Sequence, residues 1–177
     1  MAPNNDNASD LQLPKGGPDM KCLTISAVAL SLLGFASTGA QAQTKLFFYG
    51  DLERGNQPGL PPACVLNNQF KHLEKVVWRL RIHDQTGQEL NDKGLKSVTV
   101  QLPDGQKFDA RFGGHPPREP TDYLWAAAWI VPKEYPTGTF AYKVIATDLE
   151  GNTHSWEPFK VKSSQLTILD GEIEIKK

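Results

Sequence analysis

The sequence predicts an all-β domain, a two-sheet antiparallel sandwich, that follows a signal peptide. Three observations predict this fold class. Apolar and polar residues alternate along several short segments, Asp-Gly or Gly-Asn turns join pairs of them, and Gly and Pro separate the rest. No helical pattern competes with the alternation. Seven or more short strands at this spacing are typical of a two-sheet sandwich.

A leader is expected over the first 42 residues. Met20 and Lys21 begin a short basic segment, residues 23–36 are apolar, and Ala40-Gln41-Ala42 matches the small-x-small pattern that signal peptidase cleaves. An uncleaved membrane anchor is the alternative, but the apolar segment is shorter than the roughly 20 residues that span a bilayer. We therefore expect a signal peptide over residues 20–42 and a periplasmic or secreted protein without a membrane span after cleavage.

Residues 1–19 do not fit the beginning of that signal. They are polar and carry three aspartates against one lysine, whereas the first part of a signal peptide is positively charged. We expect translation to begin at Met20, and residues 1–19 to be either an artefact of start-site assignment or a disordered extension. Residues 43–177 then form a single domain.

The strands are expected in the following order. Short apolar runs at residues 45–49 and 64–66 come first, and then the alternation from Val76 to His83 gives a strand with one apolar and one basic face. Residues 98–102 and 108–112 flank an Asp-Gly turn and form a hairpin. Residues 123–131 follow. A second hairpin joins residues 140–146 to residues 156–161, and a last strand covers 165–169.

The segment from residue 135 to residue 161 resembles the end of bacterial immunoglobulin-like (immunoglobulin or fibronectin III-like) domains. It combines a glycine, alternating aromatic residues, a Val-x-Ala-x-Asp run and a Gly-Asn turn, at Gly138, Phe140, Tyr142, Val144, Ala146, Asp148, Gly151 and Asn152. The resemblance implies an immunoglobulin-like sandwich in which Asp148 and Asn152 shape the last turn. It departs from the antibody pattern in lacking a second cysteine, and Phe140 lacks the hydroxyl of a tyrosine corner, for which Tyr142 could substitute. Such domains are mostly adhesive, carbohydrate-binding or accessory modules.

Cys64 is the one cysteine outside the leader, because Cys22 lies within it. Three interpretations stay open: a small buried apolar residue, an intermolecular disulfide that makes a homodimer, or a metal ligand together with His72. A type 1 copper site is disfavoured, because no methionine follows the leader.

A recognition surface is expected from a loop and the strand after it. The Gly113–Pro117 loop presents His115 between glycines and prolines, with Arg118 close by, although a purely structural turn is the alternative. In the next strand Tyr123, Trp125 and Trp129 share one parity, and the other parity is also apolar. This pattern indicates a central strand covered on both faces or, alternatively, an aromatic binding platform.

The formal net charge of −1 and the lack of a basic run exclude an electrostatic footprint for nucleic acid. No nucleophile elbow, phosphate-binding glycine loop or zinc-hydrolase motif is present in the sequence, so we expect no enzyme and no cofactor. The sequence thus predicts an exported, non-catalytic binding or accessory module that recognises a protein or glycan. The alternative is a periplasmic metal-binding or redox accessory protein that uses Cys64 and histidines.

Overall fold

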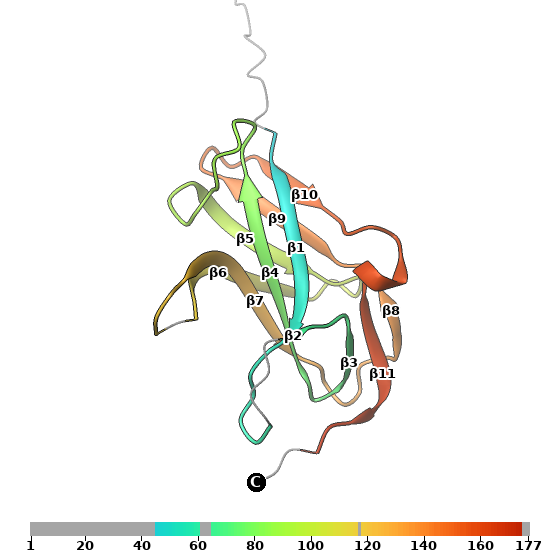
Figure 1. The fold of residues 1–177 in the computed structure, drawn as a ribbon. Helices are drawn as coiled ribbons and strands as arrows, with labels where there is room; N and C mark the ends of the chain where they lie inside the picture. Colours follow the sequence, from blue (N-terminus) through green and yellow to red (C-terminus); the bar gives the residue numbers. More distant parts are fainter. Residues whose placement is uncertain (1–44, 61–64, 117, 175–177) are drawn as a thin grey trace, which may run out of the picture. The chain divides into compact units, whose positions relative to one another are not determined.

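The alternation read from the sequence produces strands throughout the described chain. The computed structural model describes residues 45–60, 65–116 and 118–174, all within one compact unit, Gln41–Lys177. The expectations about the leader and about Cys64 lie outside the described residues. The strands are β1 (Phe47–Arg54), β2 (Val65–Leu66), β3 (Gln69–His72), β4 (Lys75–His83), β5 (Leu95–Gln101), β6 (Lys107–His115), β7 (Asp122–Ile130), β8 (Gly138–Phe140), β9 (Lys143–Asp148), β10 (Thr153–Trp156) and β11 (Leu166–Glu172) (Figure 1).

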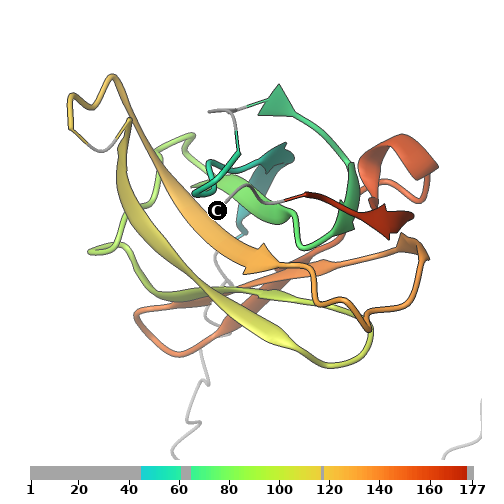
Figure 2. The same ribbon diagram turned by 90° about the horizontal axis from the view of Figure 1, so that it is seen from below.

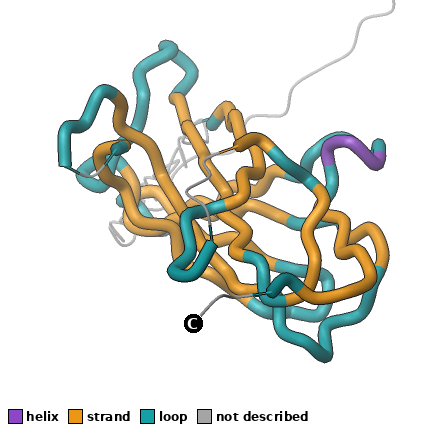
Figure 3. The backbone as a smooth tube through the Cα atoms, turned by 60° about the horizontal axis from the view of Figure 1, so that its bottom comes forward, coloured by secondary structure: helices purple, strands orange, loops and turns teal. Residues whose placement is uncertain are grey.

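The all-β prediction is confirmed. The described residues contain no α-helix, only one 3₁₀ turn at Lys162–Ser164 (Figure 3). None of their helical segments has the length and apolar character needed to cross a membrane.

The strands form two sheets. Eight strands lie in the order β10-β9-β5-β6-β7-β4-β1-β2, and three more in the order β3-β11-β8. The large sheet is strongly curled, and Figure 2 shows its long strands β6 and β7 running side by side through the bend. One detail of the prediction is wrong: β3 and β11 pair in parallel, so the strands are not all antiparallel. These two strands are far apart in the sequence, and no hairpin forces them to run in opposite directions.

The first expected hairpin is confirmed. A second hairpin also forms after residue 140, but its second strand is β10 at Thr153–Trp156, whereas the sequence predicted residues 156–161. The turn between β5 and β6 places Gly105 at a φ of 89°, and the turn between β9 and β10 places Gly151 at 93°. Residues with a side chain rarely adopt this left-handed conformation, which is why glycine occurs at both turns. The second hairpin is shorter than expected, because β10 ends at Trp156 and Pro158, which has no backbone N–H, follows two residues later.

The core lies inside the curl of the large sheet. Trp78 of β4 is fully buried and stacks on Phe108 of β6, with ring centroids 5.5 Å apart. Trp129 of β7 lies 6.4 Å from the Trp78 ring, and Tyr142, just before β9, lies 6.0 Å from it on the other side. This cluster ties β4, β6, β7 and β9 together, and it leaves β1 and β10 at the margins of the sheet.

Candidate functional site

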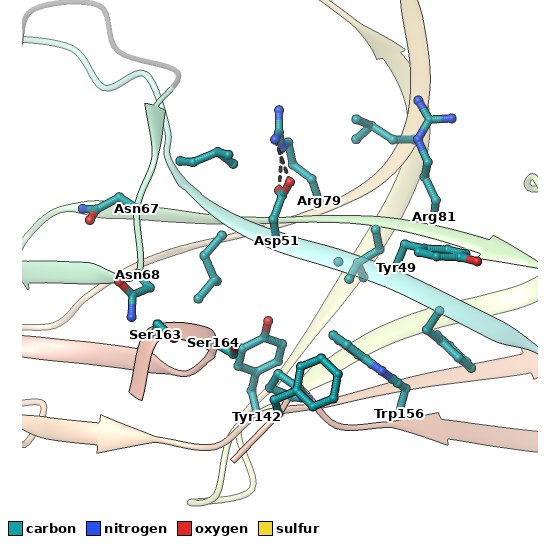
Figure 4. Close-up of a pocket in the computed structure, with 18 of the residues that line it drawn as sticks. Tyr49, Asp51, Asn67, Asn68, Arg79, Arg81, Tyr142, Trp156, Ser163 and Ser164 are labelled. Carbon is teal, nitrogen blue, oxygen red and sulfur yellow. Dashed lines mark hydrogen bonds and ion pairs between the residues drawn. The ribbon is translucent and has the colours of Figure 1, made fainter. Parts of the chain in front are cut away.

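A groove of about 900 Å³ runs along β1. On one side lies β1 itself, and on the other lie Tyr142, Trp156 and the segment that leads from Pro158 to Ser164. Figure 4 shows Tyr142, Trp156, Ser163 and Ser164 on one side of the β1 ribbon and the Asp51–Arg79 pair on the other. We call this feature the β1 groove.

One edge of β1 has little strand pairing. Strand β4 pairs with β1 over its whole length, from Phe47 opposite His83 to Arg54 opposite Val76. On the opposite edge, within the described residues, β2 pairs only with Glu53 and Arg54. The first six residues of β1 therefore have a strand neighbour on one side only.

Two hydrogen bonds show to which edge of β1 the N–H and C=O groups of each residue point. The Leu52 carbonyl accepts from the Asn67 N–H on the side away from β4, whereas the Gly55 N–H donates to the Lys75 carbonyl on the β4 side. Backbone groups of successive strand residues point to alternate edges. The N–H and C=O groups of Phe48 and Gly50 therefore face the β1 groove.

Gly50 lies at the middle of this edge and is exposed. A Cβ atom at this position would come within 2.7 Å of Leu80 Cδ2 and 3.4 Å of Trp156 Cζ3. Leu80 and Trp156 therefore occupy the position where a side chain at residue 50 would lie, and the glycine lets them pack directly against the β1 backbone. Glycine inside a strand often marks close approach of another backbone or a ligand.

Aromatic rings form the inner wall of the groove. The rings of Phe48 and Trp156 are stacked with centroids 6.5 Å apart, and Tyr142 meets Trp156 edge-on at 6.4 Å. Tyr142 is only 3 % exposed, and no described residue forms a hydrogen bond with its hydroxyl. Burial raises the pKa of Tyr142, and the negative charge of Asp51 raises it further. Because its hydroxyl bonds to no described residue, Tyr142 does not form the hydrogen bond of a tyrosine corner.

Large apolar side chains are exposed around the groove. Tyr49 is 60 % exposed, Leu66 63 % and Phe159 81 %, and all three line the cavity. Single exposed apolar residues are normal, but several around one cavity mark a surface that binds something.

The charged side chains of the groove are paired with one another. Arg79 donates two hydrogen bonds of 2.8 Å to the Asp51 carboxylate and lies 3.3 Å from the buried carboxylate of Glu53. Arg81 bridges Glu89 and Asp122. The hydrogen bond from Arg81, reinforced by the backbone N–H of Tyr123, lowers the pKa of Asp122. These carboxylates are paired with arginines, an arrangement that suits positioning.

The two asparagines of the groove also bond within the chain. Asn68 Nδ2 donates to the carbonyls of Lys162 and Gln165, at 2.8 and 3.1 Å. The Asn67 side chain donates to the Gln69 carbonyl and accepts from the Gln69 N–H. Both amides therefore hold loops in place.

The aromatic platform expected on residues 123–129 is not formed in the structure. Trp125 and Trp129 are 4 % and 8 % exposed, because their parity of β7 faces the core. The expectation that both faces of this strand are covered is also wrong in part, because Ala128 and Ile130 are exposed on the opposite face. Tyr123 is exposed at the end of the strand, where it stacks on Phe112 at 6.2 Å.

The loop residues of the expected surface lie apart from the β1 groove. His115 ends β6 opposite Asp122, and it is partly exposed, while Arg118 is exposed in the loop that follows. Neither residue lines the groove, although Asp122 does. The structure thus places His115, Arg118 and Tyr123 near one another at one end of the β6–β7 hairpin and separates them from the buried tryptophans.

His72 is engaged by main-chain carbonyls. Its Nε2 lies 2.8 Å from the Tyr135 carbonyl oxygen and its Nδ1 lies 3.2 Å from that of Gly171. Both ring nitrogens are therefore directed at carbonyl oxygens of the protein itself rather than at an open coordination site. Among the described residues there is also no cluster of three or more His, Cys, Asp or Glu side chains that could hold a metal.

A second, smaller cavity of about 470 Å³ is lined by three prolines, Tyr135 and Phe140. Burial, with the charge of Asp104 and a hydrogen bond to it, raises the pKa of Tyr135 to about 12. The Tyr135 hydroxyl in this cavity is thus already bonded within the protein, in contrast to the Tyr142 hydroxyl in the β1 groove.

The sequence reasoning did not identify Gly50, Tyr142 or Phe159 as site residues. One signal was present: Phe47-Phe48-Tyr49-Gly50 interrupts an aromatic strand with a glycine, a sign of close backbone approach. Comparison of the chain with models of known protein families finds no match. Comparison with curated proteins also finds no match.

Proposed function

We propose that the protein is an exported, non-catalytic binding or accessory module that recognises a protein or glycan partner in the β1 groove. The observation that carries this proposal is the combination, at one edge of the sheet, of unpaired main-chain groups, a cavity of about 900 Å³ and exposed apolar side chains. An edge strand that is open and apolar invites pairing with another molecule unless it is protected.

We also propose that the large sheet has the architecture of an immunoglobulin-like sandwich. Seven of its strands, taken in chain order as A to G, would be β1, β4, β5, β6, β7, β9 and β10. The pairings then read A-B-E-D and C-F-G, which is the constant-type immunoglobulin order. In this interpretation the pairing of β5 with β6 connects the two halves, and the β1 groove lies between strands A and G. An experimental structure with the two halves packed face to face would support the assignment.

The binding proposal is tested by comparing the proteins and glycans that bind to two double variants. Phe159→Ser with Leu66→Ser removes apolar surface from the groove. Leu149→Ser with Ile130→Ser removes exposed apolar side chains, 65 % and 51 % exposed, that do not line it. Immobilised wild-type and variant proteins are incubated with periplasmic extract of the native organism and with a glycan array.

We expect the groove variant to lose a bound protein or glycan that the wild type and the control variant both keep. All four substitutions affect exposed side chains, so each should change stability by no more than about 0.5 kcal/mol. If the groove variant and the wild type retain the same molecules, the groove is not the binding site.

A further inference from the structure

We propose that the β1 groove binds an extended polypeptide segment, which joins the large sheet as an additional strand beside β1. This inference rests on the proposed binding function and names the chemical class of the partner. Three features of the groove support it: the direction of the main-chain groups of β1, the cavity on the inner side of Gly50, and the pairing of the polar side chains.

The main-chain groups of β1 have the spacing that an added strand requires. The N–H and C=O groups of Phe48 and Gly50 point into the groove at every second residue, as in any strand ladder. Strand β2 already uses the same edge, because it pairs with Glu53 and Arg54 and the Asn67 N–H bonds to the Leu52 carbonyl. A partner strand would continue along the path that β2 begins. Addition of a strand to a free edge is a common mode of peptide recognition.

A residue of the added strand that lies opposite Gly50 would point toward the cavity. In a ladder the side chains of directly opposed residues lie on the same face. The residue opposite Gly50 would therefore point inward, to the side on which Leu80, Tyr142 and Trp156 line the cavity. Its neighbours along the added strand would point outward, beside Tyr49 and Asp51. A partner with an apolar residue between two polar ones fits this arrangement.

The polar side chains of the groove favour a peptide over a glycan. Recognition of a sugar would need free amide, carboxylate or guanidinium groups for its hydroxyls. Here Arg79 is paired with Asp51 and Glu53, and both asparagines bond to main-chain atoms of the chain itself. Among the described groove residues, the polar groups without a partner in the protein include main-chain groups and the hydroxyls of Tyr49, Ser163, Ser164 and Tyr142. The nearly buried Tyr142 hydroxyl points from below toward β1 (Figure 4).

The test begins with a defined probe. Linear peptides of about 12 residues, displayed on phage, are selected on the purified protein. The protein is isolated from cells that express the full chain, so that any processing of its leader has taken place. Selected peptides are then synthesised with single backbone N-methyl groups at each position in turn. If the peptide adds as a strand, alternate N-methyl groups should lower its affinity by about tenfold or more, and the intervening ones should have little effect.

A matched pair of protein variants probes the other side of the same hydrogen bonds. Gly50→Ala adds a Cβ atom but keeps the N–H that faces the groove, whereas Gly50→Pro adds it and removes the N–H. Because this N–H does not pair with β4, proline is compatible with its position on the edge. We expect the proline variant to bind the selected peptide about tenfold more weakly than the alanine variant. If the proline variant does not fold, the N-methyl series still decides the question.

The possible results separate this inference from the proposed function. Alternating sensitivity to N-methylation supports strand addition. Uniform insensitivity, with binding still lost in the Phe159→Ser and Leu66→Ser variant, overturns strand addition but leaves the binding groove. Binding of a glycan that depends on the same residues also overturns strand addition and leaves the binding groove. Self-association that Gly50→Pro abolishes overturns the proposed peptide partner as well, since the occupant of the groove is then a second copy of the chain. If no peptide, glycan or copy depends on groove residues, both proposals are wrong.

Discussion

Strands β7 and β1 both carry aromatic side chains, but the two strands expose them to very different degrees. Trp125 and Trp129 of β7 are 4 % and 8 % exposed, whereas Phe47 and Tyr49 of β1 are 42 % and 60 % exposed. Strand β7 is paired on both edges, with β6 and β4, and its aromatic parity faces the core. Strand β1 is fully paired on one edge only, and Phe47 and Tyr49 lie on its outer parity.

This difference shows what decides whether an aromatic side chain is available to a partner. Composition does not decide it, because both strands are rich in aromatic residues. The position of the strand in the sheet and the parity of the residue decide it together. An aromatic side chain on a central strand contributes to stability, and one on an edge strand is available for recognition.

The largest effect expected is on stability, from a substitution in β7. Trp125→Ala should lower the free energy of unfolding by about 3–5 kcal/mol, because it leaves a cavity in the core. It also removes the 2.9 Å hydrogen bond from the indole N–H to the Leu90 carbonyl. Tyr49→Ala on β1 should change the free energy of unfolding by about 0.5 kcal/mol or less. Urea denaturation of both variants measures the contrast, and equal losses would show that β1 is not an open edge.

A smaller loss is expected from the ion pairs that join β1 to β4. Arg79→Met leaves the Glu53 carboxylate, which is 3 % exposed, without its cation. We expect a loss of about 2–3 kcal/mol, near the lower end for buried pairs because Arg79 is partly exposed. Arg81→Met, in a more exposed network with Glu89 and Asp122, should cost about 1 kcal/mol or less.

Chemical denaturation measures these losses, and a double variant is the control for the Arg79 substitution. Adding Glu53→Gln to Arg79→Met removes the unpaired charge and should recover part of the stability. If it recovers nothing, the loss comes from packing of the arginine side chain rather than from the unpaired, buried Glu53 charge.

Local features of the fold could be predicted from the sequence. The alternation at Val76–His83 and the turns at Gly105 and Gly151 depend on neighbouring residues, and they appear in the structure as expected. The order of the strands could not be predicted, because it depends on pairings between distant segments, such as β1 with β4 and β3 with β11. Without the order, nothing in the sequence identifies β1 as an edge.

The candidate site was misjudged for a related reason. Both parities of residues 123–130 are apolar, so periodicity alone cannot assign the face that points to the core. The larger tryptophans occupy the core-facing parity, and the small alanines and Ile130 remain on the other. Tyr142 was considered only as a hairpin residue and a possible tyrosine corner, since its approach to the groove depends on the curl that brings β9 and β10 toward β1.

The turn between β9 and β10 should make stability depend on pH. Burial raises the pKa of Asp148, but hydrogen bonds from Asn152 and His154 outweigh it, and the net effect is a pKa of about 2. A lowered pKa stabilises the fold above the usual value of 3.8, and this contribution is lost as the pH falls toward 2. Thermal unfolding should show wild type above Asp148→Asn in Tm at pH 5, with the two converging near pH 2. A constant difference would contradict the assignment.

The smallest effect expected comes from the hydroxyl that faces the groove. Tyr142→Phe should change stability by about 0.5 kcal/mol or less, because no described residue bonds to that hydroxyl. Tyr135→Phe is the matched control, since the Tyr135 hydroxyl bonds to Asp104 and its loss should cost about 0.5–1.5 kcal/mol. For a peptide selected on the groove the order should reverse, with Tyr142→Phe weakening binding and Tyr135→Phe leaving it unchanged. If Tyr142→Phe costs more stability than Tyr135→Phe, its hydroxyl has a partner inside the fold and is not available to an added strand.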